Sequence, residues 1–380
     1  MFLKLGAIAF GGPAVHIGMF EDEVVNKRKW MDRQHFLDLV GATNLIPGPN
    51  STEMAIHIGY HKGGIPGAFI GGICFMITSV VITGVLAYFY LLYGSLPSVE
   101  PFLYGIKPAV IIIILNAVYK LGVKAVKGEG NVLRVKLVMI AFIVAALNLY
   151  GLNEIYSLLA GGIFGALFLL VPQIKLSSFS PLILIPLLIL NTAAQTIEKT
   201  AVSLSKLFFT FLKIGAVWFG SGYILVAYFN GEFVQGLHWL TRKELLDAIA
   251  VGQFTPGPLL SSATFIGYLI AGVPGAVLAT AGIVIPSFVF VLILNPIVPR
   301  IRQSVYLSKF LDAVNVSALA VMFIVAVKLG AEVIIPAAGF SWKALLIALL
   351  SATAFVSFKR INSAYVVFGG AALGYILSLV

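Results

Sequence analysis

The chain has 380 residues, of which 60% are hydrophobic and only 11% are charged, and its mean hydropathy is +1.02. Soluble domains are about half apolar and about a quarter charged, so this composition excludes a soluble globular protein and indicates a polytopic membrane protein. The net charge of +10 gives no reason to expect a nucleic-acid partner, because Lys and Arg lie in short loops between apolar segments, where they set orientation in the membrane.

About thirteen apolar segments follow one another along the chain, most of them near the roughly 20 residues that a spanning helix needs. They lie at about 2–20, 36–60, 66–93, 103–122, 133–150, 154–171, 182–197, 207–229, 244–270, 274–298, 308–329, 343–358 and 361–380. We therefore expect an all-helical protein that is embedded in the lipid bilayer.

The second half of the chain repeats the first. Phe2-Leu3-Lys4-Leu5-Gly6 matches Phe211-Leu212-Lys213-Ile214-Gly215, and Pro47-Gly48-Pro49 matches Pro256-Gly257-Pro258, each 209 positions later. Beyond these motifs the offset is 208, as in Pro66-Gly67-Ala68 and Pro274-Gly275-Ala276. The sequence thus predicts a first repeat at 1–172, a linker with one extra transmembrane helix at 173–206, and a second repeat at 207–380.

The parity of the segments predicts that the second repeat is inverted in the membrane. Each repeat carries six apolar segments and one more lies between them, so an odd number separates equivalent points if every segment spans. If the broken first segments of both repeats are re-entrant, the parity is unchanged. Inverted repeats with broken helices are an architecture of secondary transporters.

The distribution of positive charge predicts the orientation. Most Lys and Arg residues, including Lys62, fall on the side of the N-terminus, so we expect the N-terminus in the cytoplasm and the C-terminus outside. Lys27-Arg28-Lys29 fall outside if residues 2–20 span once, and return to the cytoplasm if that segment is a hairpin broken at Gly11-Gly12-Pro13. We favour the hairpin.

Two Pro-Gly-Pro motifs interrupt otherwise helical apolar segments, at Pro47-Gly48-Pro49 and Pro256-Gly257-Pro258. Proline removes an N–H group and clashes with the preceding turn, so two prolines this close unwind a helix. In a bilayer, freed backbone groups are tolerated where they are buried in protein or line a wet cavity. A second break is expected at Phe10-Gly11-Gly12-Pro13 and its counterpart Phe219-Gly220-Ser221-Gly222, although close helix packing is an alternative reason for the glycines.

Each Pro-Gly-Pro motif is followed by residues that suit the start of a helix, whose N–H groups and partial positive charge form an anion site. We expect Pro49 to be the first residue of a half-helix, and the repeats to face each other across the site. The alternative is that the hydroxyl groups only satisfy freed carbonyls. The candidate substrate-binding residues are Gly11, Gly12, Pro13, Asn44, Pro47, Gly48, Pro49, Asn50, Ser51, Thr52, Gly220, Ser221, Gly222, Gln253, Thr255, Pro256, Gly257, Pro258, Ser261 and Ser262.

Glu53 and His16 are the candidates for coupling transport to protons. Glu53 follows Pro49 by four residues, so a bound dianion would favour its protonation, and ionisable residues inside membranes are functional candidates. The alternatives are a capping carboxylate, a carboxylate paired with a lysine, and a structural histidine. The single cysteine, Cys74, leaves no cysteine-based metal cluster, and no metal, nucleotide, cofactor or nucleophile motif is present, which argues against an enzyme.

The combined motifs resemble the chromate ion transporter family in its two-domain form, over nearly the whole chain. In the first repeat the resemblance is carried by Phe10-Gly11-Gly12-Pro13 with His16, Trp30, Pro47-Gly48-Pro49-Asn50-Ser51-Thr52 and Gly59-Tyr60. In the second it is carried by Gly252-Gln253-Phe254-Thr255-Pro256-Gly257-Pro258, Ala263-Thr264-Phe265-Ile266-Gly267-Tyr268, Pro274-Gly275-Ala276 and Ile285-Pro286-Ser287-Phe288.

The resemblance implies an inner-membrane carrier that exports chromate with the proton-motive force, with sulfate as a related tetrahedral dianion. The chain departs from the family at Asn44, where members resemble Gln253, and at Thr78, where the second repeat has Pro286. A sulfate or other oxyanion carrier and an anion channel stay open as alternatives. The oligomeric state stays open too, with a homo-oligomer as one possibility.

Overall fold

The computed structural model describes residues 1–10, 13–43, 46–94, 96–126, 134–170, 202–219, 222–294, 305–336, 339–358 and 361–379. These parts of the chain are helical and contain no strand, which confirms the predicted all-helical class. Most of the linker predicted at 173–206, including its extra helix, lies outside the described residues.

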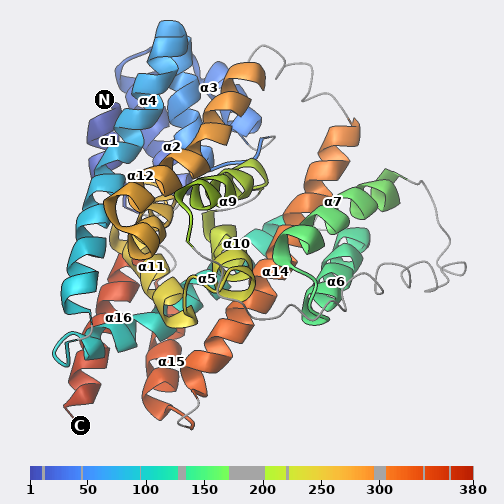
Figure 1. Ribbon diagram of the computed structural model, residues 1–380. Helices are drawn as coiled ribbons and strands as arrows, with labels where there is room; N and C mark the ends of the chain where they lie inside the picture. Colours follow the sequence, from blue (N-terminus) through green and yellow to red (C-terminus); the bar gives the residue numbers. More distant parts are fainter. Residues whose placement is uncertain are drawn as a thin grey trace, which may run out of the picture.

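The helices of the first repeat recur in the second in the same order (Figure 1). Those of the first repeat are α1 (Phe2–Ile8), α2 (Pro13–Glu21), α3 (Arg33–Thr43), α4 (Asn50–Tyr93), α5 (Glu100–Val126), α6 (Val135–Leu149) and α7 (Glu154–Leu170). Those of the second are α9 (Leu204–Ala216), α10 (Leu225–Phe229), α11 (Arg242–Phe254), α12 (Ser261–Leu294), α14 (Val305–Ile334), α15 (Trp342–Ser357) and α16 (Ser363–Ser378).

Helix α4 is folded back on itself at Gly63 and Gly64, which leave helical geometry with φ/ψ of −147/24° and 60/−148°. Its arms pack closely, because a Cβ on Gly59 would strike the backbone oxygen of Gly67. Helix α12 turns in the same way at Ala271 and Gly272, with −146/27° and 61/−149°. At about 1.5 Å per residue, the first arm of α4 covers about 20 Å and the second about 43 Å, so only the second is long enough to cross the membrane.

Within the part of the chain that the structure describes, four helices are long and apolar enough to cross a membrane: α4, α5, α12 and α14. The shorter apolar helices are α6, α7, α15 and α16. The predicted segment at 2–20 is divided into α1, of 7 residues, and α2, of 9 residues. Neither has the length of a spanning helix, so the first segment is broken, as the motif at residues 10–13 predicted.

The two repeats exchange helices. Helices α6 and α7 of the first repeat pack against α14 of the second, and α15 and α16 of the second pack against α5 of the first (Figure 1). Gly105 on α5 comes so close to Gly370 on α16 that an added Cβ would strike its backbone oxygen. Helices α4 and α12 also pack against each other. The core is therefore built between the repeats.

The second repeat is inverted relative to the first. The second arm of α4 runs to the lower end of the molecule in Figure 1, where α5 begins, whereas α12 ends at the upper end, near the start of α14. The N-terminus lies at the upper end and the C-terminus at the lower end. An inverted pair of helical repeats is thus the architecture of this multi-pass membrane protein.

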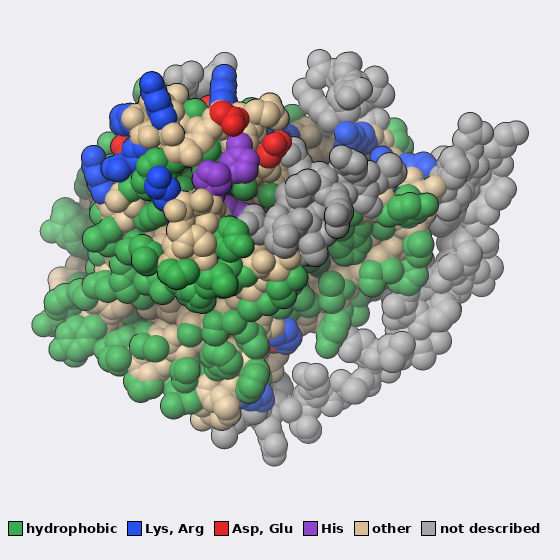
Figure 2. Space-filling model, turned by 90° about the horizontal axis from the view of Figure 1, so that it is seen from above, with side chains coloured by type: hydrophobic (Ala, Val, Ile, Leu, Met, Phe, Trp, Pro, Cys, Tyr) green, Lys and Arg blue, Asp and Glu red, His purple; other side chains and the backbone are tan. Residues whose placement is uncertain are grey.

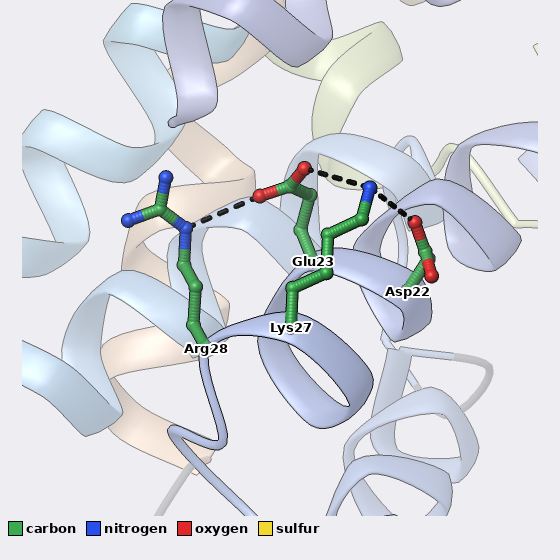
Figure 3. A network of polar contacts seen from close by, with 4 residues as sticks. All are labelled: Asp22, Glu23, Lys27 and Arg28. Carbon is green, nitrogen blue, oxygen red and sulfur yellow. Dashed lines mark hydrogen bonds and ion pairs between the residues drawn. The ribbon is translucent and has the colours of Figure 1, made fainter.

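The upper end carries a cluster of charged side chains, as Figure 2 shows from above. After α2 a π-helical turn, Asp22–Lys27, brings Lys27 within 2.6 Å of Asp22 and 3.3 Å of Glu23, and Arg28 within 3.2 Å of Glu23 (Figure 3). The hydrogen bond from Lys27 holds the pKa of Asp22 below its usual range. Such exposed pairs stabilise a fold little, so the cluster marks a face in contact with water.

Trp30 joins this cluster to the first arm of α4. Arg28 lies 5.4 Å and Lys62 lies 5.5 Å from the centre of its ring. Lys27-Arg28-Lys29 therefore lie on the same face as Lys62, which is the arrangement that the broken first segment predicted.

Candidate functional site

The Pro-Gly-Pro motif of the first repeat separates two helices. Helix α3 ends at Thr43 and α4 begins at Asn50, with Pro49 as its N-cap in an extended conformation. Pro49 therefore precedes the half-helix instead of being its first residue, which is a shift of one position from the prediction. Gly48 has a φ of +145°, a conformation that only glycine adopts without strain.

The second motif separates α11, which ends at Phe254, from α12, which begins at Ser261. Gly257 also has a positive φ, of +100°. Leu259 and Leu260 form a turn between Pro258 and the helix, so α12 begins three residues after Pro258, whereas α4 begins directly after Pro49. The two half-helix starts are equivalent in place but differ in local geometry.

Each glycine is held by the opposite repeat. The N–H of Gly48 donates to the carbonyl of Trp218 at 2.7 Å, and the N–H of Gly257 donates to the carbonyl of Ala9 at 2.8 Å. Trp218 lies 209 positions after Ala9, as Gly257 does after Gly48, so the exchange is reciprocal. Ala9 and Trp218 each precede the second break of their repeat, and all four predicted breaks thus meet in one region.

A small pocket lies where the breaks meet. Its lining residues come from both repeats and are His16, Pro49, Asn50, Ser51, Trp218, Gly222, Pro258 and Leu259. A second small pocket shares Gly222 and Leu259 with the first and includes Gln253 and Ser262. No Lys, Arg, Asp or Glu is among the described residues that line either pocket.

Helix starts supply the electrostatic character of this region. The N–H groups of Thr52 and Glu53 donate to the carbonyl of Pro49 at 2.8 and 3.1 Å, so the amides before them stand at the positive end of the half-helix. In the second repeat, Ser261 donates its N–H to Pro258 at 3.3 Å and Ser262 donates to Leu259 at 3.1 Å.

Glu53 lies on the same half-helix as the pocket residues Asn50 and Ser51, and it is fully buried. Neither carboxylate oxygen has a hydrogen-bond partner among the described residues, so there it neither caps the helix nor pairs with a lysine. One of them contacts the position that a Cβ on Gly48 would take, and so does the hydroxyl of Ser287 on α12.

His16 is held between α1 and α4. Its Nε2 lies 3.2 Å from the carbonyl of Ala9, and its ring meets Phe75 edge-on at 5.6 Å. The side chain is only 2% exposed, and Nδ1 has no partner among the described residues. His16 is one of the residues that line the pocket.

Other predicted residues lie apart from the pockets or outside the description. The hydroxyl of Thr255 donates to the carbonyl of Val251 at 2.6 Å and lies 3.2 Å from that of Thr83. Pro47, Thr52, Pro256, Gly257 and Ser261 line neither pocket. Pro13 begins α2. Gly11, Gly12, Asn44, Gly220 and Ser221 lie outside the described residues.

The sequence model of the chromate transporter family matches the chain twice, at residues 1–166 and 205–375. The chain belongs to the chromate transporter family. It is 33% identical over 339 residues to a protein named "Probable chromate transport protein" of Synechococcus elongatus, covering 87% of this chain and 83% of that protein. It is 30% identical over 381 residues to a chromate transport protein of Cupriavidus metallidurans, covering 99% and 91%.

Some relatives have half this length. An uncharacterized transporter of Bacillus subtilis is 24% identical over 166 residues, which cover 44% of this chain and 92% of that protein. No solved structure shows a significant match to this chain. This chain therefore has a relative with about the length of one repeat.

Sequence reasoning missed several residues of this chromate transporter family member that the fold brings to the site. Trp218 and Leu259 line the pocket, and Ser287 meets Gly48; no local motif marks them as site residues. Asp247 is fully buried and lies 3.6 Å from Lys107. Lys107 stands within an apolar segment, and that position is the signal that could have found this pair.

Proposed function

We propose that this protein is a secondary active transporter that moves chromate, a small tetrahedral oxyanion, across the cytoplasmic membrane. The observation that carries the proposal is the pocket between the two repeats, which is lined by Pro49, Asn50 and Ser51 from one half-helix start and by Pro258 and Leu259 from the other. The names of the relatives from Synechococcus elongatus and Cupriavidus metallidurans support chromate as the substrate.

An anion suits this pocket because helix N-termini supply unpaired N–H groups and partial positive charge. Phosphate and sulfate ions bind to helix N-termini for the same reason. The lack of a full positive charge among the described lining residues also suits a carrier, since it must release its substrate on the other side. The two helix starts come from inverted repeats, so an anion between them meets similar donors from either direction.

Alternating access follows from the same arrangement. The breaks are where the backbone of one repeat bonds to the other, through Gly48 with Trp218 and Gly257 with Ala9. A rocking motion of one repeat against the other would open the pocket to one side and then to the other, as in other inverted-repeat carriers.

For direction and energy, we propose efflux coupled to the proton-motive force, with the N-terminus in the cytoplasm and the C-terminus outside. The cluster of Lys and Arg at the N-terminal face supports this orientation. Glu53 is the first candidate for the coupling group, because it is a buried carboxylate beside the half-helix start, and His16 in the pocket wall is the second.

The experiment that tests the proposal is counterflow in proteoliposomes. Vesicles with purified protein, loaded with unlabelled chromate, should transiently accumulate labelled chromate from outside, and uptake should saturate. Vesicles without protein are the control. A flux that neither saturates nor runs uphill would indicate a channel, and absence of any flux of chromate or sulfate would contradict the proposal.

A further inference from the structure

Two buried oxygen-bearing side chains from opposite repeats meet at Gly48. Glu53 on α4 and Ser287 on α12 both contact the position that a Cβ on Gly48 would take. Both side chains have 0% exposure. The two carboxylate oxygens of Glu53 and the hydroxyl of Ser287 have no hydrogen-bond partner among the described residues. This cradle, consisting of Gly48, Glu53 and Ser287, thus holds three buried oxygen atoms, and no positively charged group bonds to them within the described residues.

An ionised carboxylate without a partner is strongly disfavoured in such a place, because burial removes its hydration. A proton or a bound cation removes the penalty. Between Ser261 and Leu294, α12 has no charged residue. The other helices that pack against α4 are α1, α2, α3 and α11. Apart from tyrosines and Cys74, the charged and titratable side chains on α4 and on these four helices are Lys4, His16, Glu21, Arg33, His35, Asp38, Glu53, His57, His61, Lys62, Arg242, Lys243, Glu244 and Asp247. Within the described residues, none of these side chains forms a hydrogen bond or ion pair with the carboxylate of Glu53.

We infer that the cradle of Gly48, Glu53 and Ser287 is a binding site for one small monovalent cation, a proton or Na⁺; the inference rests on the proposed transport function and gives its coupling step a location. With a proton, the carboxylic acid of Glu53 donates its O–H to the hydroxyl oxygen of Ser287. With Na⁺, the carboxylate and hydroxyl oxygens are ligands of the hard type that this ion prefers. Unwound backbone beside a half-helix is a known place for such ions in carriers.

Occupancy of the cradle joins the repeats, because Glu53 belongs to the first and Ser287 to the second. The half-helix that starts at Asn50 leads from the oxyanion pocket to Glu53. The cation therefore lies close to the oxyanion, where its charge favours anion binding. A dianion exported with one such cation carries a net charge of −1, so the inside-negative membrane potential, which is one part of the proton-motive force, drives its efflux. A loaded cradle ties α4 to α12, and an empty one leaves a buried charge that favours a conformation in which water reaches Glu53.

The equivalent place in the other half is not a cation site. Ser79 lies next to Gly257, with its Cβ 3.0 Å and its hydroxyl 3.1 Å from the position of an added Cβ. However, the hydroxyl of Ser79 already donates to the carbonyl of Met76 at 2.8 Å. Ser261 and Ser262 stand where the first repeat has Glu53. The asymmetry gives one cation per transport cycle and makes Ser79 a matched control.

The first test measures cation binding together with sulfate binding in detergent. Sulfate is added to purified protein in weakly buffered solution with a pH indicator, with NaCl or choline chloride. Wild type should take up about one proton per sulfate bound, or else bind sulfate at least tenfold more tightly in NaCl. Glu53→Gln should bind sulfate without either effect, Ser287→Ala should show a weakened effect, and Ser79→Ala should behave as wild type.

The second test needs no oxyanion, so that a failure of the proposed function is separable from a failure of the site. The midpoint of thermal unfolding of the empty protein is measured from pH 6 to 8, in NaCl and in choline chloride. Because a ligand that binds only the folded state stabilises it, wild type and Ser79→Ala should depend on the cation more than Glu53→Gln does. A dependence on pH identifies the proton and a dependence on NaCl identifies Na⁺. Equal behaviour of wild type and Glu53→Gln in both tests would overturn the site, even if chromate counterflow is intact.

Discussion

Lys107 of α5 and Asp247 of α11 form an ion pair across the interface of the repeats, with 3.6 Å between Nζ and Oδ1. Asp247 is completely buried and also accepts a hydrogen bond of 2.8 Å from the hydroxyl of Tyr90. Breaking a buried pair by removing one partner costs about 3–5 kcal/mol. The pair therefore joins the two repeats at a point away from the pocket.

We expect Asp247→Asn to lower the stability of the protein by about 3 kcal/mol, because Lys107 keeps its charge without a partner. The midpoint of thermal unfolding in detergent measures the change. Asp38→Asn is the matched control, since Asp38 is the counterpart on α3 and is only half-buried. The double variant Lys107→Met/Asp247→Leu should recover most of the loss; if it is less stable than Asp247→Asn, the pair itself is not the cause.

Cysteines at Gly63 and Ala271 should label from opposite sides of the membrane. These two residues stand at the equivalent turns of α4 and α12 and share the same backbone geometry, and the inverted repeats place the turns at opposite faces. Each variant is made in a Cys74→Ser background and treated with a membrane-impermeant thiol reagent on sealed and inside-out vesicles. Labelling of both from the same side would contradict the inversion.

The double variant Pro47→Ala/Pro256→Ala should lose oxyanion transport while it still inserts and remains monodisperse in detergent. Alanine at both motifs restores helix-forming groups and closes the region that the breaks keep open. Counterflow of labelled chromate measures the loss. Pro108→Ala is the control, because Pro108 lies inside helix α5 and away from the pockets; full transport in the double variant would mean that the breaks are only kinks.

Chromate and sulfate should compete for the same site. Both are tetrahedral and doubly charged at neutral to alkaline pH, and backbone N–H groups at two helix starts respond to charge and shape. We expect inhibition constants within about tenfold of each other, which corresponds to roughly 1.4 kcal/mol. Inhibition of labelled chromate counterflow by graded sulfate measures this, and a large excess of sulfate without effect would reject a site made of generic donors.

The architecture was predictable because short sequence motifs determine it. The repeat follows from matching motifs, and the breaks follow from the two Pro-Gly-Pro motifs. The starts of the half-helices were predicted less accurately. Pro49 is the N-cap of α4 and not its first residue, and α12 begins at Ser261, three residues after Pro258.

The contacts between distant residues were not predictable in the same way. Ser287 reaches Gly48, Trp218 lines the pocket, and Lys107 reaches Asp247 only because α4, α5, α11 and α12 pack as they do. No motif in the neighbourhood of these residues states which partner they meet.

The exchange of helices between the repeats has a consequence for biosynthesis. Helices α6 and α7 find their packing surface on α14, which begins more than a hundred residues after α7 ends. At the usual rate of about 5–20 residues per second, synthesis of α14 begins roughly 7–27 seconds after α7 is complete. During that interval the surfaces of α5, α6 and α7 face only lipid or the insertion machinery, so the first half of the newborn chain must wait for the second half to reach its native structure.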